Sequence, residues 1–388
     1  MSEWKKVSLS EMGIVSRGKS KHRPRNDARL YGGRYPFIQT GDIGAAGLYV
    51  TDYSQTYNDE GLAQSKLWEK NTLCITIAAN IADTALLAFP ACFPDSIMGF
   101  VPYKDVSNVM YVKYCFDILK KDCQQISQGT AQDNLSWKKL STIKFPCPPL
   151  EVQNRIATIL SRYDSLIENY QKQIKLLDEA AQRLYKEWFV DLHFPGHENT
   201  KIIDGVPEGW EKKTIGDIVV YYDKQRKPLS STQRMNMEKI YPYYGAAALM
   251  DYVDSYLFDG IYLLLGEDGT VITPDNFPVL QYVWGKFWVN NHAHVLRGKD
   301  GISTEFLYSM FKEMPIADIV TGAAQPKISQ GRLSDKKILM PSLKLIQEWS
   351  SIAKHYFGRI RMITEQIRLL IEARDRLLPK LMSGEIAV

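Results

Sequence analysis

The chain has 388 residues, of which 45% are apolar and 24% are charged, a composition typical of a folded globular protein with two or three domains. No apolar run reaches the ~18 residues that a membrane helix needs, and the N-terminus lacks the apolar segment of a signal peptide. We therefore expect neither a membrane protein nor a secreted one. The formal net charge is only +4, so any surface that binds nucleic acid must be local.

The cysteines indicate the compartment. All five lie in the first half of the chain, their number is odd, and no two form a Cys-x-x-Cys pair. This pattern argues against a disulfide framework and against a zinc site. We expect reduced, buried thiols in a cytoplasmic protein. The residues are Cys74, Cys92, Cys115, Cys123 and Cys147.

Residues 1–149 predict a globular domain with both strands and helices. A basic loop comes early, because five of the nine residues from 17 to 25 are Arg or Lys, and Gly and Pro interrupt any helix there. The other predicted elements are a short strand ending in a turn at 35–43, a buried strand at 72–78, a helix at 110–123, a glycine-containing loop at 127–136, and a strand at 143–149 closed by prolines.

Residues 150–192 predict the first of two long helices. From 150 to 189 apolar residues recur at alternating steps of four and three, which is the a/d pattern of a heptad repeat, and no Gly or Pro interrupts it. At about 1.5 Å per residue such a helix is roughly 60 Å long. The seam residues are Ile156, Leu160, Tyr163, Ile167, Tyr170, Ile174, Leu177, Ala181, Leu184 and Trp188.

The chain then repeats itself. A linker without periodicity at 193–206 leads to a second domain at 207–341 and to a second long helix at 342–388. Each residue of the second seam follows a residue of the first seam by 193 positions, and Arg374 stands at the position of Ala181. The second seam consists of Tyr356, Ile360, Ile363, Ile367, Leu370, Leu377 and Leu381.

The second domain carries counterparts of the first domain's segments. They are a basic segment at 224–227, a strand at 241–245, a buried strand at 261–265 that ends in the turn 266–269, and a loop at 322–329 that follows the first loop by 193 positions. The predicted fold is α+β. It has two α/β domains with mixed β-sheets, separated by two long antiparallel helices that form a coiled coil, and an internal pseudo-twofold repeat.

Motifs for catalysis are missing from the sequence. There is no Walker loop, no Gly-x-Gly-x-x-Gly and no Asn/Asp-Pro-Pro-aromatic stretch of the kind that base-amino methyltransferases use. His292 with His294, and His193 with His197, have the spacing of metal ligands, but no carboxylate or Cys cluster accompanies them, so we favour a structural role and predict no metal site. The turn 266–269 suits a sequence-reading tip better than a catalytic carboxylate. We expect no enzyme active site.

The repeated basic segments predict contacts with DNA phosphates, although one such run by itself would suit a solvated loop equally well. Lys and Arg neutralise phosphates and provide salt-dependent affinity without sequence specificity. The predicted phosphate contacts are Arg17, Lys19, Lys21, Arg23, Arg25, Lys224, Arg226 and Lys227.

Polar residues on the turns predict base reading, because amides suit adenine edges, carboxylates suit cytosine amino groups and arginine suits guanine. The candidates in the first domain are Gln39, Thr40, Asp42, Asn80, Gln132 and Asn134, together with Gly129 and Ser136 of the same loop. Those in the second domain are Tyr244, Glu267, Asp268, Gln325 and Lys327, together with Gly322 and Ser329.

Two interpretations of the helices stay open at this point. If they pair antiparallel, with a domain at the N-terminal end of each, helix length acts as a ruler between two DNA half-sites. The alternative is a structural coiled-coil adaptor whose two globular domains bind proteins.

One motif joins each domain to its helix. Gly129-Thr130-Ala131-Gln132 is followed by Pro148-Pro149-Leu150-Glu151-Val152-Gln153 and Ile156, which is similar to the signature Gly-x-x-Gln…Pro-Leu-x-x-Gln-x-x-Ile. The second copy, 322–347, is degraded, because it lacks the double proline and is one residue shorter. With the restart Pro207-Glu208-Gly209-Trp210 and the ending at 380–386, the whole chain resembles the specificity (S) subunits of type I DNA restriction–modification enzymes.

The resemblance implies a non-catalytic DNA reader that recognises a bipartite, gapped sequence, one half with each target-recognition domain. It implies two methyltransferase (M) subunits as partners, and restriction (R) subunits in the full complex. S-adenosylmethionine, ATP and Mg are then expected in the partner subunits, and no cofactor in this chain. Recognition domains vary freely in this family, so the base-reading residues above rest on the residue chemistry alone.

Overall fold

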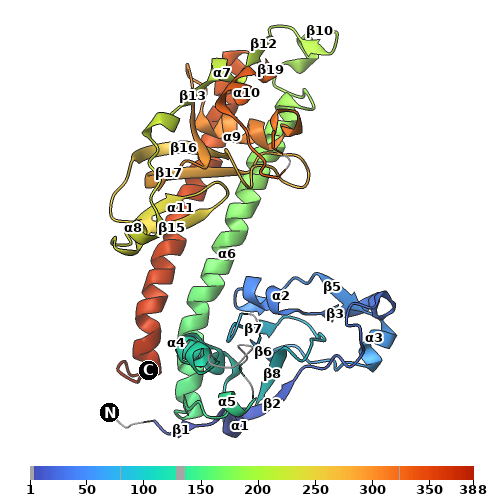
Figure 1. Ribbon diagram of the computed structural model, residues 1–388, viewed down its shortest axis with the longest axis vertical. Helices are drawn as coiled ribbons and strands as arrows, with labels where there is room; N and C mark the ends of the chain where they lie inside the picture. The colour runs from blue at the N-terminus through green and yellow to red at the C-terminus, as the bar shows by residue number, and fades with distance from the viewer. Residues whose placement is uncertain (1–3, 79, 128–134, 136, 323) are drawn as a thin grey trace. The chain divides into compact units, whose positions relative to one another are not determined.

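The computed structural model of the protein describes residues 4–78, 80–127, 135, 137–322 and 324–388 (Figure 1). The chain forms two compact units. Unit 1 comprises Met1–Gln171 and Gln366–Val388, and unit 2 comprises Lys172–Glu365. Within the described residues, no helix combines the length and the apolar character that crossing a membrane requires.

Unit 1 contains a mixed sheet of five strands with two short strand pairs. Its strands are β1 (Lys6–Val7), β2 (Gly13–Arg17), β3 (Tyr31–Phe37), β4 (Tyr49–Val50), β5 (Gln55–Tyr57), β6 (Leu73–Thr76), β7 (Thr84–Leu87), β8 (Ile97–Pro102) and β9 (Phe145–Pro146). The order in the main sheet is β2-β8-β6-β7-β4. β4 pairs with β7 in parallel, whereas the other neighbours in this sheet are antiparallel.

The helices of unit 1 are α1 (Leu9–Met12), η1 (Ala28–Leu30), α2 (Thr40–Ala45), α3 (Asp59–Ala63), α4 (Val109–Ser127) and α5 (Trp137–Leu140). The predicted buried strand and helix are confirmed as β6 and α4. The strand predicted at 35–43 is correct only to Phe37. The Gln39 backbone N–H donates to Asp42 at 2.7 Å, and this cap starts α2. The strand predicted at 143–149 is shorter than expected, because only Phe145 and Pro146 pair with β1.

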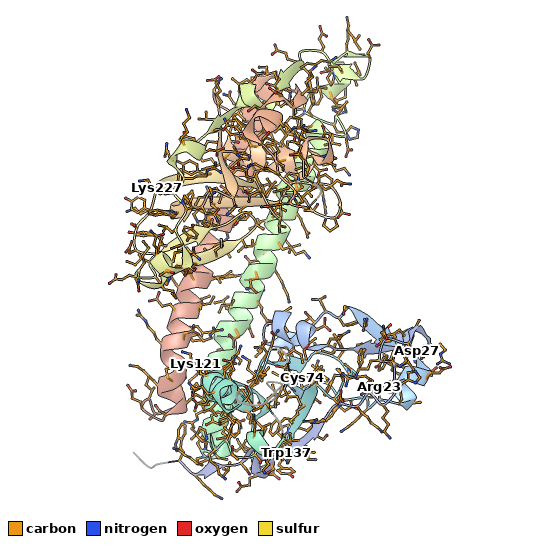
Figure 2. All side chains as sticks on the ribbon, viewed as in Figure 1. Arg23, Asp27, Cys74, Lys121, Trp137 and Lys227 are labelled. Carbon is orange, nitrogen blue, oxygen red and sulfur yellow. The ribbon has the colours of Figure 1, made fainter. Side chains whose placement is uncertain are left out.

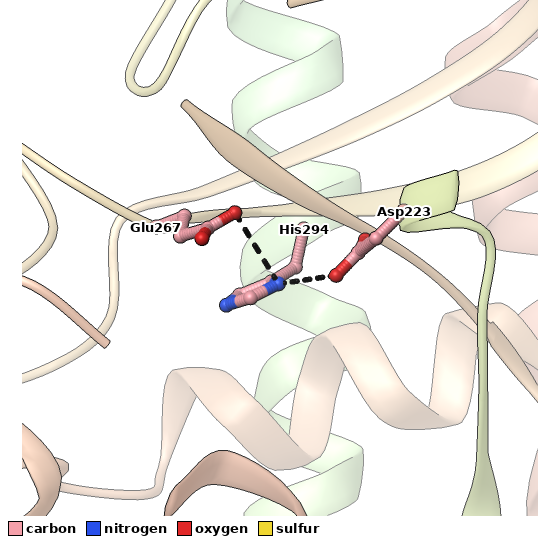
Figure 3. A group of neighbouring side chains, drawn as sticks. All are labelled: Asp223, Glu267 and His294. Carbon is pink, nitrogen blue, oxygen red and sulfur yellow. Dashed lines mark hydrogen bonds and ion pairs between the residues drawn. The ribbon is translucent and has the colours of Figure 1, made fainter. Parts of the chain in front are cut away.

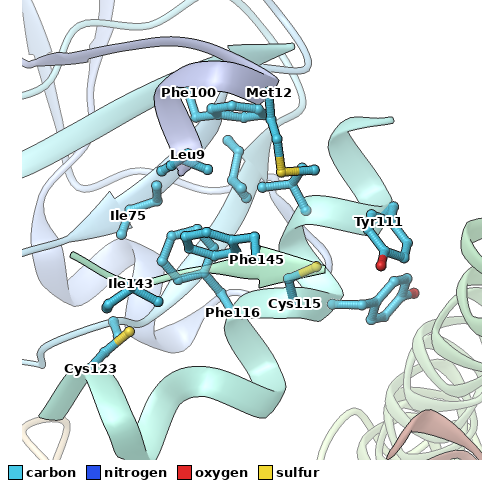
Figure 4. Packing of buried hydrophobic residues seen from close by; sticks show 14 of the residues in the cluster. Leu9, Met12, Ile75, Phe100, Tyr111, Cys115, Phe116, Cys123, Ile143 and Phe145 are labelled. Carbon is cyan, nitrogen blue, oxygen red and sulfur yellow. The ribbon is translucent and has the colours of Figure 1, made fainter. Parts of the chain in front are cut away.

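The core of unit 1 lies where α4 and β9 pack on the sheet. Figure 4 shows Phe116 of α4 beside Phe145 of β9, and Tyr111 and Cys115 of α4 belong to the same buried cluster as the sheet residue Phe100. All five cysteines are free, and four of them are buried, whereas Cys147 is half-buried. The prediction of unpaired thiols is therefore confirmed.

Unit 2 repeats this architecture with longer strands. Its strands are β10 (Ile202–Ile203), β11 (Val206–Pro207), β12 (Glu211–Thr214), β13 (Val219–Tyr221), β14 (Tyr241–Tyr244), β15 (Leu249–Val253), β16 (Phe258–Gly266), β17 (Leu280–Val289), β18 (Ala293–Gly298) and β19 (Lys337–Met340). Its shorter helices are η2 (His197–Asn199), α7 (Ile215–Ile218), η3 (Asp223–Gln225), α8 (Ser231–Met235), α9 (Thr304–Lys312), η4 (Ala317–Ile319) and α10 (Gln330–Asp335). The predicted linker 193–206 is therefore not wholly irregular, since it contains η2 and the start of the β10–β11 hairpin.

The two main sheets have the same strand order. In unit 2 it is β13-β18-β16-β17-β14-β15, which repeats β2-β8-β6-β7-β4 and adds one strand. The pairing register of the central strands shows which positions correspond in the two units. In unit 1, β6 ends at Thr76, which lies opposite Ile97 of β8. In unit 2, β16 ends at Gly266, which lies opposite Ala293 of β18. The next residue after the central strand is Ile77 in unit 1 and Glu267 in unit 2, and the next residue in the neighbouring strand is Met98 in unit 1 and His294 in unit 2. The predicted internal repeat is confirmed at the level of the sheets.

Two helices of 40 residues complete the fold, α6 (Leu150–Phe189) and α11 (Leu343–Met382). Unit 1 contains the N-terminal part of α6 and the C-terminal part of α11, and unit 2 contains the other two parts. Within each unit the two helix segments therefore run antiparallel, as predicted. Every residue of the two predicted seams is buried or half-buried. The heptad pattern thus identified the packed face correctly, because apolar side chains at these steps share one side of a helix.

Candidate nucleic-acid interface

The basic loop of unit 1 is held in place by its backbone. Gly18 N–H donates to the Ile97 carbonyl at 2.8 Å and Lys19 N–H to the Phe93 carbonyl at 3.0 Å. The amides of Lys21 and His22 both donate to Gln64 Oε1, at 2.6 and 3.0 Å. Because these bonds use main-chain groups, the side chains of Arg17, Lys19 and Lys21 stay exposed.

Farther along the loop, the cations lie in ion pairs at the surface. Arg25 contacts Asp95 at 2.6 Å and Arg23 contacts the same carboxylate at 3.9 Å, and both arginine side chains are about half exposed. Figure 2 labels Arg23 and Asp27 in this part of the unit. Arg29 binds Asp27 at 2.7 Å, and this guanidinium holds the pKa of the Asp27 carboxyl well below its usual range. Water and salt screen ion pairs at the surface, so a phosphate can compete with the Asp95 carboxylate for Arg23 and Arg25.

Sequence reasoning missed two exposed cations that follow the loop, Arg29 and Arg34. Arg34 donates to the Tyr35 hydroxyl at 2.8 Å. Both lie within ten residues of the predicted run, so a longer window would have included them.

The predicted base readers of unit 1 lie at two turns. Gln39 donates to Gln55 at 2.6 Å, Asp42 caps α2, and Thr40 is the first residue of that helix. Asn80 is exposed in the turn after β6, where its carbonyl accepts from Asp83 N–H at 3.2 Å. A Cβ added at Gly44 of α2 would meet the Asn80 amide at 2.9 Å, so the two turns are neighbours. Gly129, Gln132, Asn134 and Ser136 lie outside the described residues.

In unit 2 two cations of the basic segment are exposed and the third is largely covered. Lys224 and Lys227 are exposed. The Arg226 side chain is only 12% exposed, and it contacts Glu267 at 2.6 Å and Asp223 at 3.8 Å. Its guanidinium also donates to the Ala293 carbonyl at 2.6 Å. The structure therefore places Arg226 inside the unit, where its charge is already balanced.

A buried histidine joins the same group of charges. His294 is 1% exposed, and its Nδ1 lies 2.6 Å from Asp223 and 3.8 Å from Glu267 (Figure 3). Its Nε2 lies 2.9 Å from the Ile328 carbonyl. Both ring nitrogens therefore lie within hydrogen-bonding distance of oxygen atoms of the protein. His292 likewise contacts Asp268. The expectation that no carboxylate accompanies these histidines is wrong, because the strand ends bring together residues that are distant in the sequence.

Asp223, Glu267 and His294 have the residue types and spacing of a metal site, with candidate ligand atoms within 4.8 Å of one another. However, Arg226 lies against both carboxylates. A divalent cation would lie close to this guanidinium, and the repulsion between two positive charges is strong where little water screens it. The arrangement fits an ion-pair network in which the Arg226 guanidinium supplies the positive charge and the His294 ring contributes hydrogen bonds.

The loop before α10 is tied to the turn after β16. Thr321 and Lys327 exchange backbone hydrogen bonds at 2.9 and 2.7 Å, and Gly269 N–H donates to the Pro326 carbonyl at 3.0 Å. Gly322 has φ +84°, and a Cβ there would meet the Gln325 carbonyl at 2.3 Å, so only glycine fits this tight turn.

The side chains of this loop differ in their exposure and in their contacts. Gln325 and Lys327 are exposed, whereas Ser329 caps α10. Lys327 lies 3.6 Å from Glu267.

Tyr244, the remaining predicted base reader of unit 2, lies at the end of β14. It is half-buried against Phe287, and burial raises the pKa of its hydroxyl.

Comparison with known proteins decides the family. The chain matches the type I restriction modification DNA specificity domain twice, over residues 1–178 and 207–373. It is 25% identical to the type I restriction enzyme MjaIX specificity subunit of Methanocaldococcus jannaschii, covering 100% of this chain and 94% of that protein. The chain belongs to this family. It is a DNA specificity subunit of the type I restriction–modification class, a non-catalytic component, and the adaptor interpretation is not favoured.

Two further relatives agree with this assignment. The type I restriction enzyme EcoprrI specificity subunit of Escherichia coli is 23% identical, covering 87% of this chain and 84% of that protein. The crystal structure of the type I restriction–modification S subunit from M. genitalium has the same fold, with a TM-score of 0.61, 17% identity and coverage of 97% of this chain and 96% of that one.

In this specificity subunit the signature motif builds the scaffold. Gln153 is fully buried, where its amide donates to the carbonyls of Val106 and Pro148 at 3.0 and 2.9 Å and accepts from Asn108 N–H at 3.0 Å. It therefore fixes the start of α6 to the loop before α4.

The loop ends also correspond between the units. Leu135 N–H donates to the Ile77 carbonyl at 2.9 Å, and Ile328 N–H donates to the Glu267 carbonyl at 2.8 Å. Leu135 and Ile328 are 193 positions apart, and both are fully buried. Each unit thus anchors its loop to the residue that follows its central strand.

Proposed function

We propose that this specificity subunit reads a bipartite, gapped DNA target, one half-site with each recognition domain. The proposed domains are 1–149 and 207–341, with the helical regions 150–192 and 342–388 and the linker 193–206. One repeated arrangement supports the proposal. In each unit a basic segment follows the first strand of the main sheet, β2 or β13, and a loop is anchored by a backbone hydrogen bond to the residue after the central strand, β6 or β16. Two copies of one binding architecture on one chain suit two half-sites.

The exposed cations are the proposed phosphate contacts. In the first domain they are Arg17, Lys19, Lys21, Arg23 and Arg25, and in the second they are Lys224 and Lys227. We assign base reading to the exposed amides and Lys327 on the neighbouring turns. Arg226, Asp42 and Ser329 support these turns from within, because their side chains already bind protein groups.

The long helices are the proposed spacer and the docking site for two M subunits, with R subunits joining the full complex. Exposed apolar side chains support a protein partner there: Leu176 is 63% exposed and Leu369 is 49% exposed, and the two are related by the repeat. Paired exposed leucines at equivalent positions suit two copies of one partner. S-adenosylmethionine, ATP and Mg would belong to those partners.

Methylome sequencing of a host that carries the complete system tests the proposal. The expected result is a methylated motif with two specific parts and a fixed spacer. Inserting one heptad into both helices at matched positions adds about 10 Å, so the spacer should lengthen by roughly three base pairs. The exchange Lys175→Arg, at an exposed position of α6, is the control. An uninterrupted motif would overturn the bipartite assignment, and an unchanged spacer would overturn the role of the helices as a ruler.

A further inference from the structure

We propose that His294, together with Asp223, Arg226 and Glu267, positions the loop that reaches the body of unit 2 at Ile328 for DNA contact in the second domain, whereas in the described part of the first domain the apolar residues Ile77 and Met98 stand at the positions of Glu267 and His294. The inference rests on the proposed function. It assigns to His294, Asp223, Arg226 and Glu267, called the ionic tie below, a positioning role rather than direct contact with DNA.

The ionic tie holds one residue of the loop from both sides. The Glu267 backbone carbonyl accepts from Ile328 N–H at 2.8 Å, and His294 Nε2 donates to the Ile328 carbonyl at 2.9 Å. Ile328 is fully buried. The loop therefore enters the body of the unit at a residue whose two backbone polar groups are both bound to the tie.

The same groups connect the loop to the basic segment. Arg226 joins Glu267 at 2.6 Å and the Ala293 carbonyl at 2.6 Å, while His294 joins Asp223 at 2.6 Å. Asp223 also accepts from Val295 N–H at 2.8 Å. The exposed side chains of Lys224 and Lys227 thus lie on a segment that is bound, through Asp223 and Arg226, to the loop that carries Gln325 and Lys327.

With Lys327, the charges of the ionic tie balance. Two carboxylates, Asp223 and Glu267, face the Arg226 guanidinium, and the half-exposed Lys327 ammonium lies at the edge, 3.6 Å from Glu267. The Tyr221 ring lies edge-on to His294 at 6.1 Å, and its hydroxyl accepts from Ser334 at 3.0 Å. Each buried charge therefore has a partner of opposite sign, which is the condition for burying it.

Unit 1 shows that the fold does not need these charges. Ile77 and Met98 stand at the positions of Glu267 and His294, are buried in an apolar cluster with Leu135, and the loop end is anchored by the same backbone bond. Replacing a buried ionic network with well-packed apolar residues is often neutral or stabilising. Since the stability of the fold does not require the ionic tie, we infer that the role of the tie is to position the loop.

Hydrogen exchange on the full chain tests the positioning directly. His294→Met, which copies the residue of unit 1, removes the bond to the Ile328 carbonyl. We expect the amides of Thr321, Lys327 and Ile328 to exchange roughly tenfold or more faster, because a buried hydrogen bond that holds the Ile328 carbonyl is removed. Peptides from β6 in unit 1 should keep their rates. His355→Met, the same exchange at an exposed histidine of α11, is the control.

A conservative variant keeps the test decisive if the first variant does not fold. His294→Gln retains one amide donor for the Ile328 carbonyl, so the acceleration should be smaller and confined to the same loop. Unchanged loop exchange in both variants, or equal acceleration throughout unit 2, would overturn the proposal.

DNA binding separates this inference from the proposed function. With a duplex that carries the methylated motif, His294→Met should weaken binding roughly tenfold while the slope of affinity against salt concentration stays as in the wild type, because the exposed phosphate contacts remain. A lower slope would overturn the positioning role. If the wild-type chain, with its methyltransferase partner, fails to bind the duplex, the proposed function fails, although the exchange result stands independently.

Discussion

Arg374 Nη1 lies 2.6 Å from Asp164 Oδ1, so an ion pair replaces an apolar contact in the seam between α11 and α6. Asp164 is buried, and it also accepts from the Tyr114 hydroxyl of α4. The repeat-related positions in unit 2 are Ala181 and Phe357, which are both fully buried in the apolar core. The same register thus holds a polar pair in one unit and an apolar pair in the other.

This contrast predicts the effect of making the two units alike. Arg374→Ala alone should lower the free energy of unfolding of unit 1 by about 2–4 kcal/mol, because it leaves the Asp164 carboxylate buried without its partner. Asp164→Phe with Arg374→Ala should restore stability to within about 1 kcal/mol of the wild type. Urea denaturation measures both. Arg376→Ala, which removes an arginine that is 78% exposed, is the control and should change little. A double variant as unstable as the single one would contradict the prediction.

Gln153 of the signature motif and Gln347, which ends the degraded second copy of the motif, should differ in their contribution to stability. Gln153→Leu leaves Asn108 N–H and two carbonyls without partners, so we expect a loss of about 2–4 kcal/mol. Gln347 is exposed, and Gln347→Leu should change the free energy of unfolding by less than about 0.5 kcal/mol. Denaturant titrations of the two variants side by side provide the comparison, and equal effects would disprove the scaffold role of Gln153.

Phosphate binding by the basic loop should appear in the salt dependence of DNA binding. Replacing Arg17, Lys19 and Lys21 with Glu removes three exposed cations of the loop. The slope of log affinity against log salt should fall by about 0.9 for each phosphate that the loop no longer neutralises. Lys70→Glu with Lys104→Glu and Lys121→Glu, three charge reversals at exposed positions outside the loop, is the matched control. If both sets lower the slope equally, the loop has no special part in binding.

Thiol reactivity should follow burial. Burial raises the pKa of Cys123 to about 11 and also raises the pKa of the fully buried Cys74 and Cys115 thiols. A thiol with a pKa of about 11 is roughly one part in a thousand thiolate at pH 8, and the thiolate is the reactive form. In the folded protein we expect a thiol reagent at pH 8 to modify the half-buried Cys147 first, and the buried thiols only after unfolding. Rapid labelling of Cys74 in the folded chain would contradict this order.

The sequence by itself determined the long helices, their packed faces and the repeat. Heptad steps such as Ile156 to Leu160 place side chains on one face whatever the surroundings, because helix geometry is local. The offset of 193 positions likewise located Leu135 and Ile328, which prove to be equivalent loop anchors. The same reasoning identified Arg374 as an exception within the seam, but it could not name Asp164 as its partner.

Only the tertiary structure decided which charged residues are exposed. Lys224, Arg226 and Lys227 look alike in the sequence, yet the sheet brings Asp223, Glu267 and His294 around Arg226 alone. These residues come from three segments that are far apart in the sequence, and the register of β16 and β18 sets their distances. Local periodicity carries no information about such register, because strand pairing depends on contacts made across the whole unit.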